Sequence, residues 1–241
     1  MRSLLHHSVF VIRYSIFILI LFPFLANSQD DKNWTLNGYV KDMQTVIIAD
    51  PSENWMTDNM IHNRLNFNWY PSDKLTINME MRNRFIWGEL FNMERYTPDS
   101  LLFFKYSDFI DQETGFLDVS DNLIEEKSFI LHSTLDRFYL DYTWNDFQLT
   151  IGRQRINWGQ CFVWNPNDLF NNYSFFDFDY EEKPGSDAVR IQYYTGMTSQ
   201  AEIAVKANSE DQITAAGFYR FNQWNYDFQF LGGILNDQDY V

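Results

Sequence analysis

The stretch LNFNWYPSDKLTINMEMRNR, residues 65–84, sets the pattern of this chain. Apolar side chains fill every second position of residues 65–69 and again of residues 75–81, and polar side chains fill the positions between them. Successive side chains of a strand point to opposite faces of a sheet, whereas an amphipathic helix repeats its apolar residues three and four apart. Residues 71–73, Pro-Ser-Asp, have the composition of a turn. The stretch therefore predicts a β-hairpin with one apolar and one polar face.

The same alternation recurs along the chain and predicts an all-β, antiparallel fold. With a less regular first strand near 34–46, nine strands are expected, the others lying near 65–69, 75–84, 137–144, 147–151, 189–193, 201–206, 213–221 and 226–230. Connections are short near 71–73, 145–146, 195–199 and 222–224 and long near 47–58, 88–132 and 159–186; the one near 207–211 should be long and is not. Short periplasmic turns that alternate with longer extracellular loops are typical of a transmembrane β-barrel of the outer membrane.

The N-terminus has the pattern of a secretory signal peptide. Arg2 and Arg13 make its start basic, an apolar run follows at 16–22, and the small residues Ala26 and Ser28 precede a polar segment. The run is shorter than the ~20 apolar residues that a spanning helix needs. Residues 1–28 are therefore predicted to be a signal peptide, removed after Ser28 during Sec-type export.

Residues 29–241 are predicted to form an outer-membrane β-barrel domain. Nine strands is an odd number, whereas bacterial single-chain barrels have even strand counts. The chain also ends at Val241, directly after an expected strand. We therefore expect the domain to be the N-terminal part of a larger barrel, incomplete at its C-terminus.

Charge and composition exclude several functions. Loss of Arg2 and Arg13 with the signal peptide changes the formal net charge from −15 to −17, which disfavours nucleic acid as a partner. Cys161 is the single cysteine, so no disulfide framework or thiolate metal cluster is expected. Only His62 and His132 remain for histidine-based catalysis or metal binding. Neither a metal nor a cofactor is predicted.

Aromatic residues make up 19% of the chain and gather at the ends of the expected strands. Those at short turns are Trp69, Tyr70, Trp144 and Trp224, and those at the start of long loops are Trp87 and Trp158. Aromatic rings of this kind favour the headgroup level of a membrane, which predicts two aromatic girdles. The alternative is ordinary strand composition, because Trp and Tyr favour strands in any sheet.

Most arginines fall on the polar face of the expected strands. They are Arg64, Arg82, Arg84, Arg137, Arg190 and Arg220. The apolar face, expected to meet lipid, includes Leu65, Phe67, Met79, Leu140, Leu149, Ile191 and Phe228. A charge on the lipid face near the membrane midplane costs ~2–4 kcal/mol, so the arginines are expected to line a lumen. They either bind anionic solutes or form a structural network with carboxylates such as Glu80 and Glu202.

The alternation fails after the strand at 147–151. Strict continuation would place Arg153 and Arg155 on the lipid face. A β-bulge at Gly152 would instead turn both arginines into the lumen, and Ile156 and Trp158 outward, because glycine permits the positive φ of one class of bulge. We therefore predict a bulge at Gly152 that brings Arg153 and Arg155 to the mouth of a pore.

Residues 152–159, GRQRINWG, and residues 165–168, NPND, also carry a resemblance. The run GRQ-x-x-x-WG with a downstream NPxD resembles a motif of porin-like outer-membrane proteins of Gram-negative bacteria. The resemblance is specific over 151–169 and architectural elsewhere. It implies a barrel that transports small solutes, without naming a substrate. Such proteins are usually longer, which agrees with an incomplete barrel.

The loop from Gln160 to Pro184 is rich in aromatic and acidic residues. It is expected either to fold into the barrel mouth as a constriction or to stack on sugar rings. Its acids match no EF-hand spacing.

The predicted function is a porin-like channel in the cell outer membrane that passes small, anionic or polar solutes. The alternative is a non-conducting barrel that binds or assembles surface polysaccharide. An enzyme is not expected, because His132 and Ser133 are adjacent and point to opposite faces of a strand, and His62 has no adjacent serine. The expected partners are outer-membrane lipid and small solutes or saccharides, and the oligomeric state stays open.

Overall fold

The structure is a computed structural model that describes residues 33–48, 55–89, 110–111, 115–159, 167–170 and 185–240. The chain divides into two compact units, and only the second, Thr35–Val241, falls largely within these residues. The predicted signal peptide and its cleavage site after Ser28 lie outside them. Among the residues that are described, no helix is long and apolar enough to cross a membrane.

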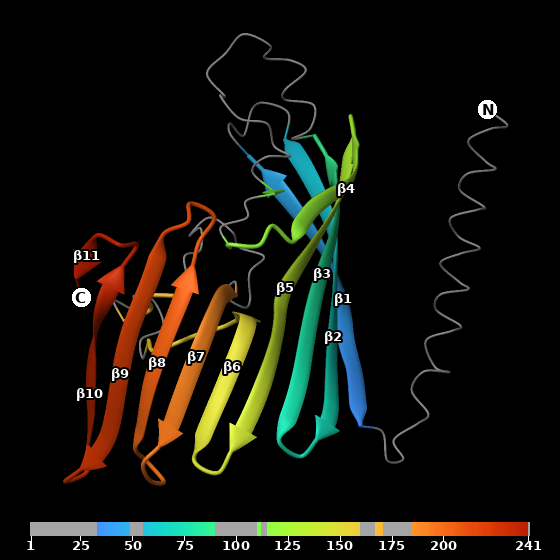
Figure 1. The fold of residues 1–241 in the computed structure, drawn as a ribbon. Coiled ribbons are helices and arrows are strands. Elements are labelled where there is room, and N and C mark those ends of the chain that lie inside the picture. The colour runs from blue at the N-terminus through green and yellow to red at the C-terminus, as the bar shows by residue number, and fades with distance from the viewer. Residues whose placement is uncertain are drawn as a thin grey trace, which may run out of the picture. The chain divides into compact units, whose positions relative to one another are not determined.

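Every named element of the described chain is a strand, and the prediction of an all-β fold is confirmed (Figure 1). The strands are β1 (Trp34–Ile47), β2 (Met56–Ser72), β3 (Leu75–Gly88), β4 (Ser120–Glu126), β5 (Phe129–Trp144), β6 (Phe147–Gln154), β7 (Ser186–Tyr194), β8 (Gln200–Ala207), β9 (Ile213–Gln223), β10 (Tyr226–Leu235) and β11 (Asp239–Tyr240). They form one open sheet in the order β1-β2-β3-β5-β6-β7-β8-β9-β10-β11, with β4 beside β5. Each pairing whose register is known is antiparallel.

The nine predicted strands are all present, and two further strands, β4 and β11, were not predicted. Glu125 and Glu126, expected in a long loop, lie in β4. The short turns join β2 to β3, β5 to β6, β7 to β8 and β9 to β10, and all four lie at the lower end of the sheet in Figure 1. Trp224 and Asn225 both have positive φ, 55° and 62°, as a type I′ hairpin turn requires.

The burial of the two sheet faces is the reverse of that in a water-soluble protein. In β8, Glu202 and Lys206 are buried, whereas Ile203 is 63% exposed and Val205 is 41% exposed. The register places all residues predicted to meet lipid on this exposed apolar face, among them Leu65, Met79, Leu140 and Ile191. The opposite face, called the polar face below, carries the paired charges.

A β-bulge interrupts the pairing of β3 with β5. Glu80 pairs with Arg137 and Met81 pairs with Leu135, so Asp136 is the extra residue. The two halves of β5 also differ in their other neighbour, because residues up to Thr134 pair with β4 and residues from Phe138 pair with β6. A bulge shifts the side-chain alternation by one residue. Asp136 and Arg137 therefore both reach the polar face, although they are adjacent in the chain.

The bulge predicted at Gly152 is wrong. Gly152 pairs with Tyr139 of β5 and with Ala188 of β7, and both ladders continue without a register shift. Its φ is +116°, and a Cβ built on it would lie 2.3 Å from the carbonyl oxygen of Phe138. Glycine is thus required here by the backbone angle and by the close approach of β5, and not by an extra residue.

Replacing Gly152 with alanine should lower the free energy of unfolding by about 1–3 kcal/mol, because the side chain meets both a disfavoured φ and a backbone oxygen. Gly217→Ala is the matched control, since its Cβ would have no atom closer than 3.8 Å and its φ is not positive. Its expected change is within about 0.5 kcal/mol. Urea titration of both folded variants measures the difference, and equal midpoints would contradict it.

Candidate functional site

The arginines of the polar face are gathered by the register of β2, β3 and β5. Arg64 pairs directly with Arg82, and Arg84 pairs with His132. Like charges directly opposite each other repel, so this arrangement needs carboxylates between them. The sheet supplies Glu80 from β3 and the bulged Asp136 from β5.

We call Arg64, Glu80, Arg82, Asp136 and Arg137 the arginine cluster. Nη2 of Arg64 lies 2.5 Å from Oε2 of Glu80, and its Nη1 lies 2.8 Å from Oδ2 of Asp136. Nη2 of Arg82 lies 3.2 Å from Oδ1 of Asp136, and Nη1 of Arg137 lies 3.6 Å from Oε2 of Glu80. None of the five side chains is more than 14% exposed. Three guanidinium groups thus share two carboxylates in a buried network.

This burial bears on the two interpretations of the arginines. Arg64 and Arg82 are each 5% exposed, and Arg84 is 7% exposed and donates from Nη2 to the carbonyl oxygen of Ile110 at 3.1 Å. Side chains this enclosed hold strands together more readily than they meet a solute. The geometry of these three arginines favours the structural network over solute binding.

The histidine and serine that could suggest catalysis are engaged elsewhere. Nε2 of His132 lies 2.6 Å from Oγ1 of Thr134, and its Nδ1 lies 3.1 Å from Oδ1 of Asn122. The hydroxyl of Ser133 donates to Oδ1 of Asn83 at 2.9 Å. Within the described part of the chain, no three His, Cys, Asp or Glu side chains come together as metal ligands.

An apolar segment packs on the polar face of β7 to β9. We call the described residues 155–159 and 167–170 the inserted segment. Its buried members Ile156, Trp158, Leu169 and Phe170 form one cluster with the strand residues Ala188, Ala204, Ala216 and Phe218. The ring of Trp158 stacks on Phe218 at 5.2 Å between centroids, and its edge contacts Phe170 at 5.0 Å. Three alanines where other strands carry charged side chains leave room for these rings.

The inserted segment corrects two expectations. Trp158 was predicted to point outward and to belong to a girdle, but it is 3% exposed on the polar face. Ile156, also predicted outward, is fully buried there. Residues 167–170 agree with a loop that folds inward, whereas the rest of the loop from Gln160 to Pro184 lies outside the described residues.

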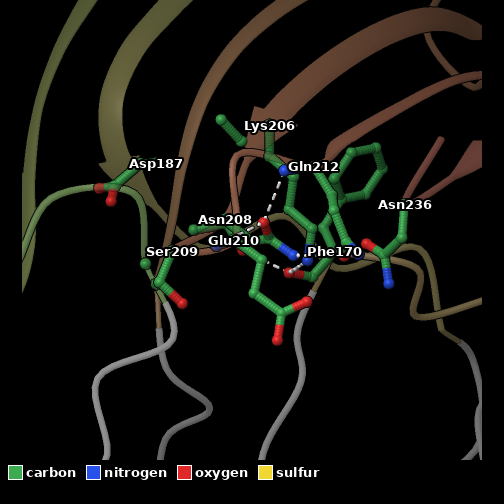
Figure 2. A pocket seen from close by; sticks show the side chains of 12 residues that line it. Phe170, Asp187, Lys206, Asn208, Ser209, Glu210, Gln212 and Asn236 are labelled. Carbon is green, nitrogen blue, oxygen red and sulfur yellow. Dashed lines mark hydrogen bonds between the residues drawn. The ribbon is translucent and has the colours of Figure 1, made fainter.

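A polar cavity of about 280 Å³ adjoins the inserted segment (Figure 2). Lys206, which is 7% exposed, lines it and donates from Nζ to the carbonyl oxygen of Phe170 at 2.9 Å. Asn208 closes the turn from β8 to β9 by accepting from the backbone N–H groups of Glu210 and Gln212. The cavity is therefore walled by a structured turn and by the end of the inserted segment.

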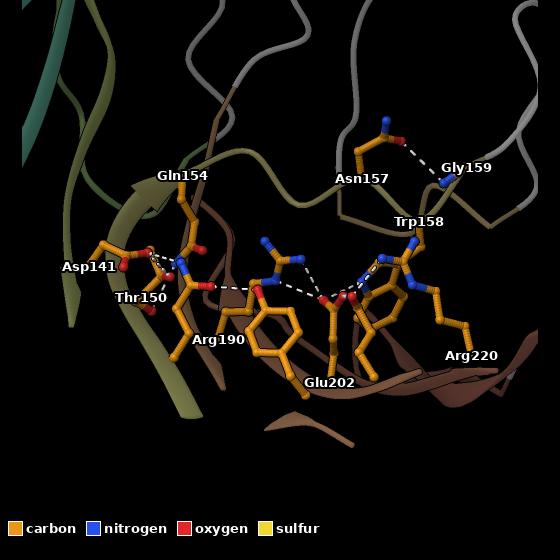
Figure 3. A network of polar contacts seen from close by, with 12 residues as sticks. Asp141, Thr150, Gln154, Asn157, Trp158, Gly159, Arg190, Glu202 and Arg220 are labelled. Carbon is orange, nitrogen blue, oxygen red and sulfur yellow. Dashed lines mark hydrogen bonds and ion pairs between the residues drawn. The ribbon is translucent and has the colours of Figure 1, made fainter. Parts of the chain in front are cut away.

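Glu202 is the centre of a second polar network (Figure 3). Its Oε2 accepts from Nε1 of Trp158 at 2.9 Å and from Nε and Nη2 of Arg190 at 2.8 and 2.6 Å. Its Oε1 accepts from Nε2 of Gln200. Oε1 of Gln200 in turn accepts from Nη2 of Arg220 at 2.6 Å. One carboxylate therefore anchors the inserted segment and neutralises Arg190.

Arg153 and Arg155, the arginines of the GRQ motif, have separate surroundings. Arg153 donates from Nε and Nη2 to the two carboxylate oxygens of Asp187, at 2.9 and 2.8 Å, and from Nη2 to the carbonyl oxygen of Leu117 at 2.5 Å. It is buried and links the chain at Leu117 to the start of β7. Arg155 follows β6, is half-buried, and has no hydrogen-bond partner for its Nε among the described residues.

Sequence reasoning missed Asp136, Gln200 and the inward position of Trp158. A signal for Asp136 was present, because two polar residues stand in a row between Leu135 and Phe138 and break the alternation by one position. Strict alternation from Ile151 also placed Trp158 in the lumen, and the bulge wrongly predicted at Gly152 reversed that assignment. No local pattern marks Gln200, because its partner Arg220 lies on the next strand. Comparisons with protein-family models, curated proteins and solved structures found no match to this chain. The proposed function therefore depends on the contrast in burial and polarity between the two faces of the sheet.

Proposed function

We propose that this chain forms the wall of an outer-membrane β-barrel channel for small polar or anionic solutes. The observation that carries the proposal is the reversed burial of the sheet, with charged side chains enclosed on one face and large apolar side chains exposed on the other. Water-soluble proteins rarely expose a contiguous apolar face of this extent. Strands that face lipid on one side and a polar lumen on the other have this pattern.

The ends of the strands support a membrane setting. Trp144, Trp224 and Tyr226, beside the short turns, are 58%, 78% and 70% exposed. Trp144 and Phe147 flank the turn from β5 to β6 and stack at 6.5 Å. Amphipathic rings at this level fit the boundary between hydrocarbon and headgroups. In the proposed barrel the edge strands of the described sheet would be paired, since unpaired backbone groups are not tolerated in lipid.

The solute class follows from the polar face. Arg220 is an exposed arginine of this face, and guanidinium groups recognise carboxylate and phosphate groups by paired hydrogen bonds. Three acidic side chains of the polar face, Glu80, Asp136 and Glu202, are engaged by arginine. Small anions and neutral polar solutes are therefore the expected cargo.

Two measurements on the full-length protein test the proposal. The mature chain should be recovered in the outer-membrane fraction, and it should give discrete conductance steps in a planar bilayer. Recovery in the soluble periplasm would overturn the membrane setting. A chain that inserts into the bilayer without conducting would overturn the channel alone.

A substitution on the apolar face should show whether this face contacts lipid or water. Ile203→Lys places a charge near the middle of β8 and should cost about 2–4 kcal/mol of folding free energy in lipid vesicles. Ser209→Lys, in the exposed turn after β8, is the matched control and should leave folding unchanged. If Ile203→Lys folded as well as the control, this face would not meet lipid.

The alternative of a non-conducting, polysaccharide-binding barrel has one observation in its favour. The inserted segment covers part of the polar face of β7 to β9 with apolar side chains. A lumen filled in this way could hold a polymer at its mouth without passing ions. Absence of conductance together with retention on an immobilised acidic polysaccharide would favour this second function.

A further inference from the structure

The arginines of the polar face differ in how their charge is compensated. Arg64, Arg82 and Arg190 each have a carboxylate oxygen within 3.2 Å. Among the described residues, Arg220 of β9 has one hydrogen bond, and its acceptor is the amide oxygen of Gln200. An amide satisfies a donor without neutralising the charge, so Arg220 keeps its full positive charge on the polar face.

The two residues that pair directly with Arg220 carry neutral amides. Gln200 of β8 pairs with Arg220 on one side, and Gln229 of β10 pairs with it on the other. Glu202, two residues from Gln200 in β8, already accepts from Trp158, Arg190 and Gln200. The hydrogen bond that Arg220 makes within the described part of the sheet therefore goes to an amide.

Gln200 also fixes the position of the guanidinium group. Its Nε2 donates to Glu202, which leaves Oε1 turned toward Arg220, where the distance is 2.6 Å (Figure 3). A guanidinium group has five N–H donors, and this contact uses one of them. Because Arg220 is exposed, the remaining donors are open to a solute.

We infer that Arg220, positioned by Gln200, is the contact of the polar face that selects anions, and that it binds the carboxylate or phosphate group of a passing solute. The inference rests on the proposed channel and names the solute chemistry of that channel. An ionised side chain in a membrane-spanning strand is costly unless it is paired or faces a water-filled path. Arg64 and Arg82 are paired with carboxylates, whereas Arg220 can bind an anionic solute.

The test is the ion selectivity of the full-length protein in planar bilayers, measured as the reversal potential in a KCl gradient. Arg220→Gln should lower the chloride-to-potassium permeability ratio by about sevenfold, because one charge at roughly 7 Å in water changes the permeation of each ion by about threefold and in opposite directions. Arg220→Lys should keep the ratio, because it keeps the charge. Lys74→Gln is the control for loss of one charge, because Lys74 lies in the exposed turn after β2.

A wild-type channel whose ratio is the same in Arg220→Gln would overturn the inference and leave the channel intact. A wild-type chain that inserts without conducting would overturn the proposed channel function. Equilibrium dialysis of inorganic phosphate against the folded protein would then show whether Arg220 binds an anion. Binding that Arg220→Gln abolishes and Lys74→Gln retains would support Arg220 as an anion contact. Equal binding in all variants, or none in the wild type, would reject it.

Discussion

Replacing Asp136 with asparagine should destabilise the folded protein by about 3–5 kcal/mol, the usual cost of removing one partner from a buried ion pair. Asp136 binds Arg64 through one carboxylate oxygen and Arg82 through the other, and its side chain is 3% exposed. An amide in its place would leave two enclosed guanidinium groups with a single remaining carboxylate, Glu80. The loss is large because neither arginine can turn to water.

The measurement is the free energy of unfolding in urea for protein folded in lipid vesicles. Asp146→Asn is the control, since it makes the same chemical change in the exposed turn between β5 and β6. A fall in stability confined to Asp136→Asn is expected. If both variants unfolded at the wild-type midpoint, the arginine cluster would not be a structural element of the sheet.

Replacing Trp158 with alanine should cost about 3–5 kcal/mol, because it removes a large buried ring and leaves a cavity against Phe170 and Phe218. Trp158→Phe should cost less, about 1–3 kcal/mol, because it keeps the ring contacts and loses the hydrogen bond to the charged Glu202. Trp144→Ala, on the opposite face, should cost at most about 1 kcal/mol, since Trp144 is 58% exposed.

Urea titration ranks these three variants, and bilayer conductance gives an independent readout. In the proposed channel, Trp158→Ala should release the inserted segment from Glu202 and raise the single-channel conductance, while Trp144→Ala should leave it unchanged. Equal stability of Trp158→Ala and Trp144→Ala would show that the inserted segment is not held on the polar face.

The faces of the strands could be predicted from sequence because side-chain alternation is a local property. Leu140, Leu149 and Ile191 lie on one face simply because each occupies an apolar position of a strand with period two. β4 escaped prediction because its seven residues are mostly polar or acidic, and only the edge of β5 makes them a strand.

The polar contacts could not be predicted because their partners are distant in the chain. The bond from Arg64 to Asp136 spans 72 residues, and the bond from Trp158 to Glu202 spans 44. Gly152 shows a different limit. The glycine correctly indicated an unusual backbone angle, and its φ is positive. Glycine is needed there because β5 lies close, and no bulge is present.

The extra residue in β5 has a consequence for how the sheet assembles. A slip of β5 by one residue against β3 would turn Asp136 to the apolar face and remove the shared carboxylate from Arg64 and Arg82. Misaligned pairing would thus leave the two buried guanidinium groups with Glu80 as their remaining carboxylate, which disfavours the wrong alignment once the three strands have paired. Asp136 therefore favours the correct register of β5 against β3. Such a preference matters most in a sheet whose contacts are distant in sequence and therefore slow to form.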